Sequence, residues 1–292
     1  MIINQSNLSN LFIGFSAIFK GALTAAKPRF ERITSVTRIK AMKVDFPWMG
    51  MVTRFSKWLS DRTIQNLKSF KWTIENVPFE NTFGVKREDI EFDTYGIYDT
   101  PVKVLGEQTR SHPDELVFGL LRQGNTQLCY DGQYFFDTDH PVGETTASNY
   151  GGGSGALWVL MATGGALKPM IMNIARDYDF QALDAPTSDN VFFRREYIYG
   201  VDAIVNAGFG MWQLVYASRQ APTDELVAAA IAAMKSLKFD NGTPMDLNPD
   251  LIVCAPSIEN TLKKIVAATL PNGASNPLSN AAEIMASAHL ID

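Results

Sequence analysis

The chain has 292 residues, of which 46% are hydrophobic and 20% are charged, and these fractions exclude a disordered or collagen-like chain. Its length fits about two domains or one large one. Acidic residues number 31 and basic residues 26, and the resulting net charge of −5 argues against a protein that wraps around DNA.

The numbers and spacing of the cysteines and histidines argue against a fold held together by disulfide bonds or by a zinc ion. Two cysteines, Cys129 and Cys254, are too few for a disulfide framework, and their apolar neighbours predict buried free thiols, as in a reducing compartment. The histidines at 112, 140 and 289 do not have the spacing of a zinc site.

The sequence predicts neither a membrane span nor a signal peptide. No run of 18 apolar residues is present, and the first basic residue, Lys20, follows most of the apolar stretch 11–26 instead of preceding it. We therefore expect a cytosolic protein.

Charge is distributed unevenly along the chain. Residues 1–44 contain seven basic residues and one acidic residue, whereas the rest contains 19 basic and 30 acidic residues. This segment is either a solvated basic face or an arm that lies on an acidic surface, its own or a neighbour's. We expect an arm that docks on a neighbour, with Leu11, Phe12, Phe15 and Phe19 as apolar anchors.

The first third of the chain alternates between helical and extended patterns. Apolar residues at three- and four-residue spacing predict a helix over 7–22, which Pro28 would end. Residues 33–44 indicate a strand or an extended arm, and one short helix is expected at 58–65. Residues 67–92 are predicted to form a long polar hairpin, which must lean on another surface to be stable.

A helical pattern follows from residue 93. Pro113 is expected in the first turn of a helix that is capped near Ser111. The Asp-Gly pair at 131–132 predicts a hairpin turn, and the glycine-rich segment 143–155 predicts a flexible loop.

The remaining elements complete a mixed pattern. Aromatic and β-branched residues with interspersed glycines predict long antiparallel strands over 191–217. A helix over 223–237 with Thr223 as its cap, a buried strand at 251–254 and a helix at 256–268 follow. This mixed order predicts an α+β protein.

The sequence contains no clear catalytic motif. The glycines at 151–155 lack the Gly-Lys-Ser/Thr ending of a phosphate-binding loop, and a flexible loop explains them better. Asp137, Asp139 and His140, together with His112, could ligate a divalent metal, but the spacing is not that of a calcium loop and also suits a turn. We assign no catalytic, cofactor-binding or metal-ligating residue, and a soluble metal-dependent hydrolase using these four residues stays an alternative.

Several segments are similar to one protein family. The run Asp-Gly-Gln-Tyr-Phe-Phe-Asp-Thr-Asp-His-Pro at 131–141 resembles the major head subunit of Mu-like tailed bacteriophages, as do His-Pro-Asp-Glu-Leu-Val-Phe at 112–118 and the aromatic segment 190–216. The likeness covers roughly residues 5–280, and the order and spacing of its motifs make it specific.

The resemblance implies the tailed-phage major capsid fold, which is α+β. This fold has an N-terminal arm, an extended β-hairpin loop, a peripheral domain with a spine helix, and an axial domain. The expected ranges are 1–44 for the arm, 45–94 for the hairpin loop region, 95–150 and 191–217 for the peripheral domain, and 151–190 and 218–292 for the axial domain. Residues 279–292 are Ala-rich and helix-prone, unlike the strand that usually closes this fold.

The resemblance also implies a structural role instead of an enzymatic one. The chain would be the subunit of an icosahedral phage or prophage head, which self-assembles in the bacterial cytoplasm through hexamers and pentamers into a shell around DNA. The implied partners are further copies, scaffold, portal, maturation protease and packaged DNA held without sequence specificity, with no cofactor and no membrane. An encapsulin-like nanocompartment shell protein stays a second alternative.

Overall fold

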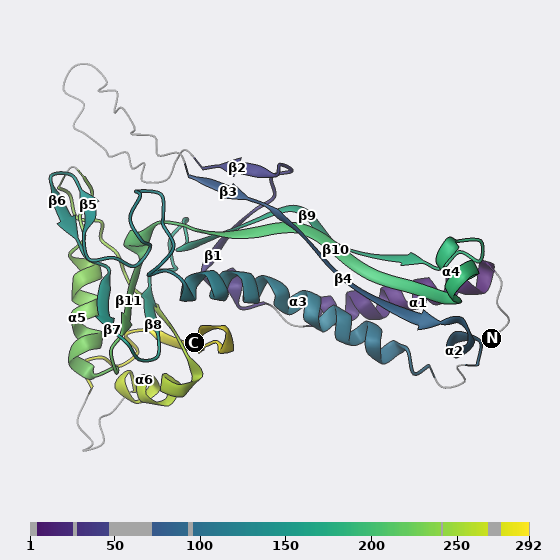
Figure 1. Ribbon diagram of the computed structural model, residues 1–292. Helices are drawn as coiled ribbons and strands as arrows, with labels where there is room; N and C mark the ends of the chain where they lie inside the picture. Colours follow the sequence, from purple (N-terminus) through teal and green to yellow (C-terminus); the bar gives the residue numbers. More distant parts are fainter. Residues whose placement is uncertain are drawn as a thin grey trace.

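The computed structural model describes residues 5–25, 28–46, 72–92, 96–240, 242–267 and 276–291. Figure 1 shows an elongated molecule, with a long sheet and two long helices at one end and a second sheet with shorter helices at the other. Within these ranges, no helix is both long and apolar enough to cross a membrane. Helices and sheets in mixed order confirm the predicted α+β class.

The long end of the molecule is built on a four-stranded sheet in the order β1-β9-β10-β4. Strand β10 is antiparallel to both of its neighbours, whereas β1 pairs with β9 in parallel. The strands are β1 (Thr34–Thr37), β4 (Val77–Lys86), β9 (Met170–Leu183) and β10 (Glu196–Phe209). Buried and half-buried residues alternate along most of β10, because successive side chains of a strand point to opposite faces.

Two long helices, α1 (Gln5–Thr24) and α3 (Asp99–Arg122), cover one face of this sheet (Figure 1). They touch each other closely at Gly106, where an added Cβ would lie 2.7 Å from the Cβ of Ala22 and 2.8 Å from the carbonyl oxygen of Phe19. Only a residue without a side chain therefore fits this crossing. The helix expected over 7–22 and the helical pattern expected from residue 93 are both confirmed.

The apolar stripe of α1 packs within its own subunit. Phe15 and Phe19 are each 2% exposed, and the ring of Phe12 stacks on Phe180 with centroids 5.6 Å apart. Leu11 packs against the same core cluster. The prediction that these residues anchor the arm on a neighbour is therefore wrong, because α3 and the sheet of the same chain already bury them.

Pro113 lies inside α3, so the prediction that it begins a helix is wrong. Proline in a helix interior removes one hydrogen bond and costs about 3 kcal/mol. Tertiary packing offsets this cost, because Val117, Phe118 and Leu121 on the following turns are all 0% exposed. The Ser111 hydroxyl donates to the carbonyl of Gln108 and caps no helix start.

The other end of the molecule is built on a five-stranded sheet in the order β13-β12-β8-β11-β7. The strands are β7 (Tyr150–Gly153), β8 (Trp158–Met161), β11 (Val215–Arg219), β12 (Leu251–Cys254) and β13 (Glu283–Ala286). Helices α5 (Asp224–Lys235) and α6 (Glu259–Ile265) share a core with this sheet. The Thr223 hydroxyl accepts a hydrogen bond from the N–H of Leu226, as the predicted cap requires.

Short elements complete the fold. Two small antiparallel pairs are β2 (Lys43–Asp45) with β3 (Thr73–Glu75), and β5 (His140–Val142) with β6 (Thr145–Ala147). The short helices are α2 (Arg87–Glu91), α4 (Asp189–Arg194), η1 (Phe30–Arg32), η2 (Trp212–Leu214), η3 (Pro256–Ile258) and η4 (Ala288–Leu290).

The described part of residues 67–92 does not form the predicted hairpin. Strand β3 pairs with β2, and β4 pairs along its whole length with β10. The polar character of β4 is explained by its place at the edge of the sheet, where only one neighbour is needed. The short helix expected at 58–65 lies outside the described residues.

Three further expectations need correction. The predicted loop 143–155 contains strands β6 and β7. The predicted strands over 191–217 are present as β10 and β11, but Phe192 and Phe193 lie on α4 and are 74% and 76% exposed. The helix-prone end 279–292 contains β13, because pairing with β12 outweighs the weak helix preference of so short a segment.

Candidate functional site

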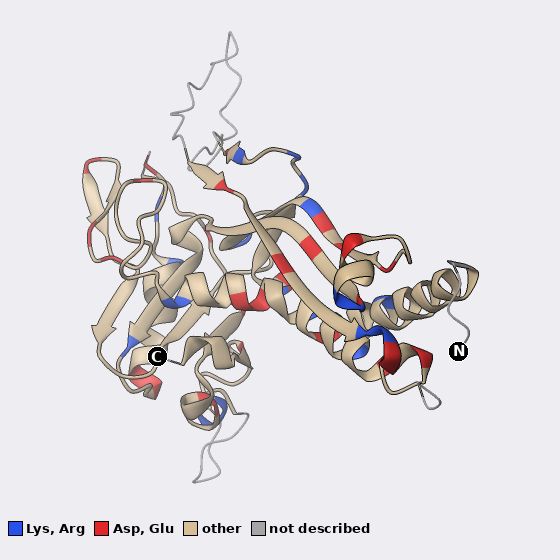
Figure 2. Cartoon of the chain, turned by 45° about the vertical axis from the view of Figure 1, so that its right-hand side comes forward, with Lys and Arg blue, Asp and Glu red and all other residues tan. Residues whose placement is uncertain are grey.

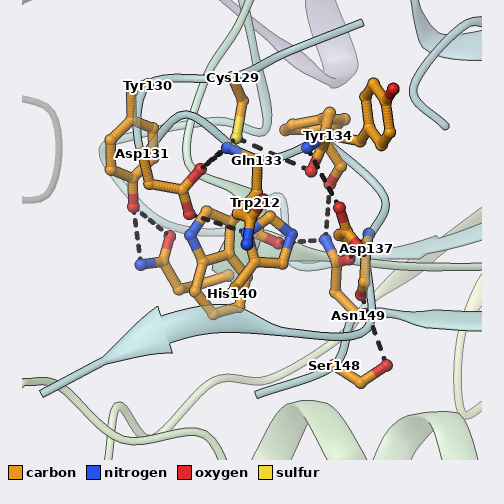
Figure 3. Close-up of polar contacts among 12 residues, drawn as sticks. Cys129, Tyr130, Asp131, Gln133, Tyr134, Asp137, His140, Ser148, Asn149 and Trp212 are labelled. Carbon is orange, nitrogen blue, oxygen red and sulfur yellow. Dashed lines mark hydrogen bonds and ion pairs between the residues drawn. The ribbon is translucent and has the colours of Figure 1, made fainter. Parts of the chain in front are cut away.

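A buried polar network lies in the segment of chain between α3 and β7 (Figure 3). The carboxylate of Asp131 accepts hydrogen bonds from Nδ1 of His140 at 2.8 Å, from Sγ of Cys129 at 3.0 Å and from the N–H of Gln133 at 3.1 Å. The imidazole of His140 stacks on the indole of Trp212, with ring centroids 4.0 Å apart. His140 is 0% exposed and Cys129 2% exposed, so this network is part of the interior.

The charges in this network suit a structural role. Burial raises the pKa of Asp131, but hydrogen bonds from His140 and Cys129 outweigh that effect, so the pKa lies below its ordinary value. Burial, assisted by the neighbouring Asp131 carboxylate, raises the pKa of the Cys129 thiol far above its ordinary value. The thiolate is the nucleophilic form of cysteine, so this thiol is unsuited to covalent catalysis.

Asn149 ties the adjoining turn to the rest of the core. Its side-chain nitrogen donates to the carbonyls of Phe135 at 2.8 Å and Trp212 at 3.2 Å, and its oxygen accepts from the N–H of Asp137. The Asp137 carboxylate in turn accepts from the N–H of Thr138. Asp137 therefore stabilises a turn, which was the simpler of the two interpretations of this motif.

The structure does not bring the four candidate metal ligands together. Within the described ranges, a single group of metal-ligating side chains has its donor atoms within 4.8 Å, and its members are Cys129, Asp131 and His140. Asp137, Asp139 and His112 are not in this group, and His112 lies on α3 with its Nδ1 2.7 Å from the hydroxyl of Tyr178. Sequence reasoning missed the partners of His140, because the Asp131 motif was interpreted only as a turn.

The glycine cluster is explained by packing. Gly152 and Gly153 have positive φ angles of 72° and 99°, and an added Cβ at Gly153 would lie 2.4 Å from the carbonyl carbon of Arg219. Gly153 thus lets β7 approach β11 closely, and Gly152 adopts a left-handed backbone conformation that glycine favours.

The basic N-terminal segment lies on acidic groups of its own subunit. The ion pairs are Arg32 with Glu283, Arg38 with Asp177, and Lys43 with Glu75. The buried Asp114 of α3 also accepts from the backbone N–H groups of Phe30 at 2.7 Å and Arg29 at 3.3 Å. The sequence left open whether this segment lies on an acidic surface of its own subunit or of a neighbour. In the structure, it pairs with acidic residues of its own subunit.

The first sheet has one face that the long helices do not cover. Strand β3 contacts β10 near one end of this face, where Ile74 lies against Gly208. Glu80, Asp179 and Asp202 lie on this face in neighbouring strands, and Figure 2 shows acidic residues recurring across this sheet.

Comparison with known proteins gives the family. The family model of the Mu-like prophage major head subunit gpT matches residues 8–290. The chain belongs to this family. The major head subunit of the Mu-like prophage FluMu of Haemophilus influenzae is 32% identical over 268 residues, covering 88% of this chain and 87% of the relative. The major capsid protein of Escherichia phage Mu is 30% identical over 291 residues, covering 96% and 95% of the two chains.

Solved structures agree with this membership. A subunit of the procapsid of bacteriophage JBD30 superposes with a TM-score of 0.87 and 34% identity, covering 98% of this chain and all of that one. This Mu-like major head subunit therefore has the phage major capsid fold and forms part of a phage head. The hydrolase and nanocompartment alternatives are not supported, and the functional sites to seek are contact surfaces.

Proposed function

We propose that copies of this subunit assemble through hexamers and pentamers into a closed icosahedral shell around DNA, in the cytoplasm of the host. The observation that carries this proposal is the similarity to the JBD30 procapsid subunit along 98% of the chain. Head-to-tail contacts between identical subunits close into rings when their rotation allows, and such rings are the units of an icosahedral shell.

Two features of the surface support this assembly. The elongated shape gives the subunit a large surface for its volume (Figure 1). Phe192 and Phe193 lie side by side on α4 with most of their ring surface exposed, and exposed apolar groups of this size are typical of interaction surfaces.

The proposal extends to the other partners. Scaffold, portal and maturation protease would act on the assembling shell, and DNA would be enclosed without tight binding, which fits the net charge of −5. The division into arm, hairpin loop, peripheral domain and axial domain is part of this proposal. The proposal also includes the absence of catalytic, cofactor-binding and metal-ligating residues, since a shell subunit acts through contacts with its neighbours alone.

Light scattering after size exclusion, followed by negative-stain microscopy, tests this function on the purified chain. We expect megadalton shells, rings or tubes at high protein concentration. A monodisperse 32.3 kDa monomer at every salt and protein concentration would contradict the proposal.

A further inference from the structure

A cavity of about 360 Å³ lies between the middle of α3 and the first sheet. Its walls come from α3, β4, β9 and β10 and include Gln108, His112, Phe79 and Tyr178. A void takes packing contacts away from the groups that line it, so the side-chain contacts beside this cavity matter more for holding the helix. One of them is neutral, since the Asn81 amide of β4 donates to Oε1 of Gln108 at 3.1 Å.

The second contact depends on His112, which is half-buried on α3. Its Nδ1 lies 2.7 Å from the hydroxyl of Tyr178 on β9. Its ring packs edge-to-face against Phe79 on β4, with ring centroids 4.5 Å apart. One titratable side chain thus links α3 to an inner strand and to the edge strand of the sheet.

The residue that follows His112 weakens the helix at the same place. Pro113 has no N–H, so it cannot donate to the carbonyl of Thr109 one turn earlier. One backbone hydrogen bond of α3 is therefore missing beside the cavity. At this point the helix depends on its side-chain contacts to stay against the sheet.

Protonation changes what His112 can do here. Burial lowers the pKa of His112 below its ordinary value of 6.5, although Glu115 on the same helix acts in the opposite direction. Burial also raises the pKa of Tyr178, so its hydroxyl stays protonated. This hydroxyl can donate to a neutral imidazole, whereas an imidazolium has no acceptor and leaves the hydroxyl proton without this partner.

Three carboxylates line the cavity, and each has another partner or is solvated. Glu80 of β4 accepts a hydrogen bond from the hydroxyl of Thr82. Asp202 of β10 pairs with Arg176. Glu115 is exposed on α3, where water screens its charge. Among the described residues of this lining, an imidazolium at position 112 therefore has no buried counter-ion.

We propose that His112 is a pH-sensitive contact between α3 and the first sheet. The neutral imidazole holds the helix against β4 and β9, and protonation loosens the helix around Pro113, where water then reaches the charged ring. The contact is present in full above the ordinary His value of 6.5 and is lost as the pH falls below it. It acts within one subunit, so it does not depend on the proposed shell function.

Hydrogen exchange followed by mass spectrometry tests this contact on the full chain in dilute solution. Exchange is measured at pH 7.5 and pH 5 and corrected for the chemical exchange rate at each pH. We expect the protection of peptides from 106–116 to fall at least about twofold at pH 5, because local opening becomes easier. Helix α5, which contains no histidine, is the internal reference and should keep its protection.

Two histidine variants separate this contact from other effects of pH. His112→Gln keeps an oxygen that can accept from the Tyr178 hydroxyl but takes up no proton, so 106–116 should be equally protected at both pH values. His289→Gln is the matched control and should still lose protection in this segment. His140 is unchanged in both variants, so any contribution from it is shared.

A third variant tests the hydroxyl directly. Tyr178→Phe removes the partner of His112 and keeps the ring, so 106–116 should already be less protected at pH 7.5 than in the unchanged chain. This measurement decides the case even if His112→Gln does not fold.

Four results would overturn the inference. The first is an unchanged chain with equal protection of 106–116 at both pH values, and the second is a His112→Gln chain with the same loss at pH 5 as the unchanged one. The third is a Tyr178→Phe chain as well protected as the unchanged chain at pH 7.5. The fourth is an NMR titration in which the imidazole of His112 in the folded chain has its midpoint at or above 6.5.

Discussion

The carboxylate of Asp131 and the imidazole of His140 lie 2.8 Å apart in the interior, with side chains only 3% and 0% exposed. A buried carboxylate is stable only when several donors satisfy it, and here two side chains and one backbone N–H do so. The pair thus fixes the turn between α3 and β5, on which the packing of His140 against Trp212 depends.

Replacing Asp131 by asparagine should weaken the fold. The variant keeps the shape of the side chain but loses the charge that the donors stabilise, so we expect the free energy of unfolding to fall by about 2–3 kcal/mol. Urea denaturation at pH 7 measures this. The exposed Asp139→Asn variant is the control and should stay within about 0.5 kcal/mol of the unchanged chain. Equal stability of both variants would contradict the role given to Asp131.

The same carboxylate should make stability depend on pH. Its pKa is lower in the folded chain than the ordinary 3.8, so the folded state favours the ionised form. This contribution is present above about pH 4 and is lost as the pH falls through the folded pKa. Urea denaturation between pH 7 and pH 3 should show a steeper acid loss for the unchanged chain than for Asp131→Asn. Parallel curves would rule this contribution out.

Two glycines of α3 should respond in opposite ways to alanine. Gly106→Ala should destabilise the subunit, because its new methyl group would meet Ala22 at 2.7 Å. Gly119 has nothing within 4 Å of an added Cβ, so Gly119→Ala should stabilise the helix by about 0.5–1 kcal/mol. Thermal unfolding of the two variants checks this. A gain in stability at both positions would show that the two helices do not cross so closely.

Removal of the Asp114 carboxylate should loosen the N-terminal segment. Asp114→Ala leaves the N–H groups of Phe30 and Arg29 without this acceptor, and we expect a loss of about 1–2 kcal/mol. Limited proteolysis should then cut the N-terminal segment faster. The neighbouring exposed Glu115→Ala is the matched control, and equal cleavage of both variants would contradict the contact.

Neither thiol should react in the native subunit. Cys129 and Cys254 are 2% and 0% exposed, and burial raises the pKa of Cys254 to about 12. A colorimetric thiol reagent at pH 8 should therefore label the protein only after urea is added, and then at both positions. Rapid labelling of one thiol per chain without urea would show that the corresponding core is open.

The sequence predicted elements whose pattern is local. Strand β12 occupies the predicted 251–254, and α5 begins directly after its predicted cap at Thr223. In both cases a continuous apolar run or a capping residue decides the structure within a few residues. The family resemblance, which depends on the order of many such segments, was also correct.

The predictions from sequence were wrong where contacts between distant parts of the chain determine the local structure. The burial of the turns that follow Pro113 keeps α3 continuous, and pairing with β12 makes 283–286 a strand. The polar network shows the same limit, because the spacing of His140 to Asp137 and Asp139 suggested ligands, whereas the folded chain pairs it with Asp131. The sequence also could not show that Glu80, Asp179 and Asp202 lie side by side, since cross-strand pairing brings them together from distant positions.

The contact between Arg32 and Glu283 spans 251 residues, and Arg29 also donates to the carbonyl of Ala286, so the two ends of the chain are joined in the folded subunit. During synthesis the N-terminal segment must wait until residues 283–286 have been made before these partners exist. Closing so long a loop is slow compared with forming the local helices. A chain interrupted before residue 283 therefore cannot complete this closure.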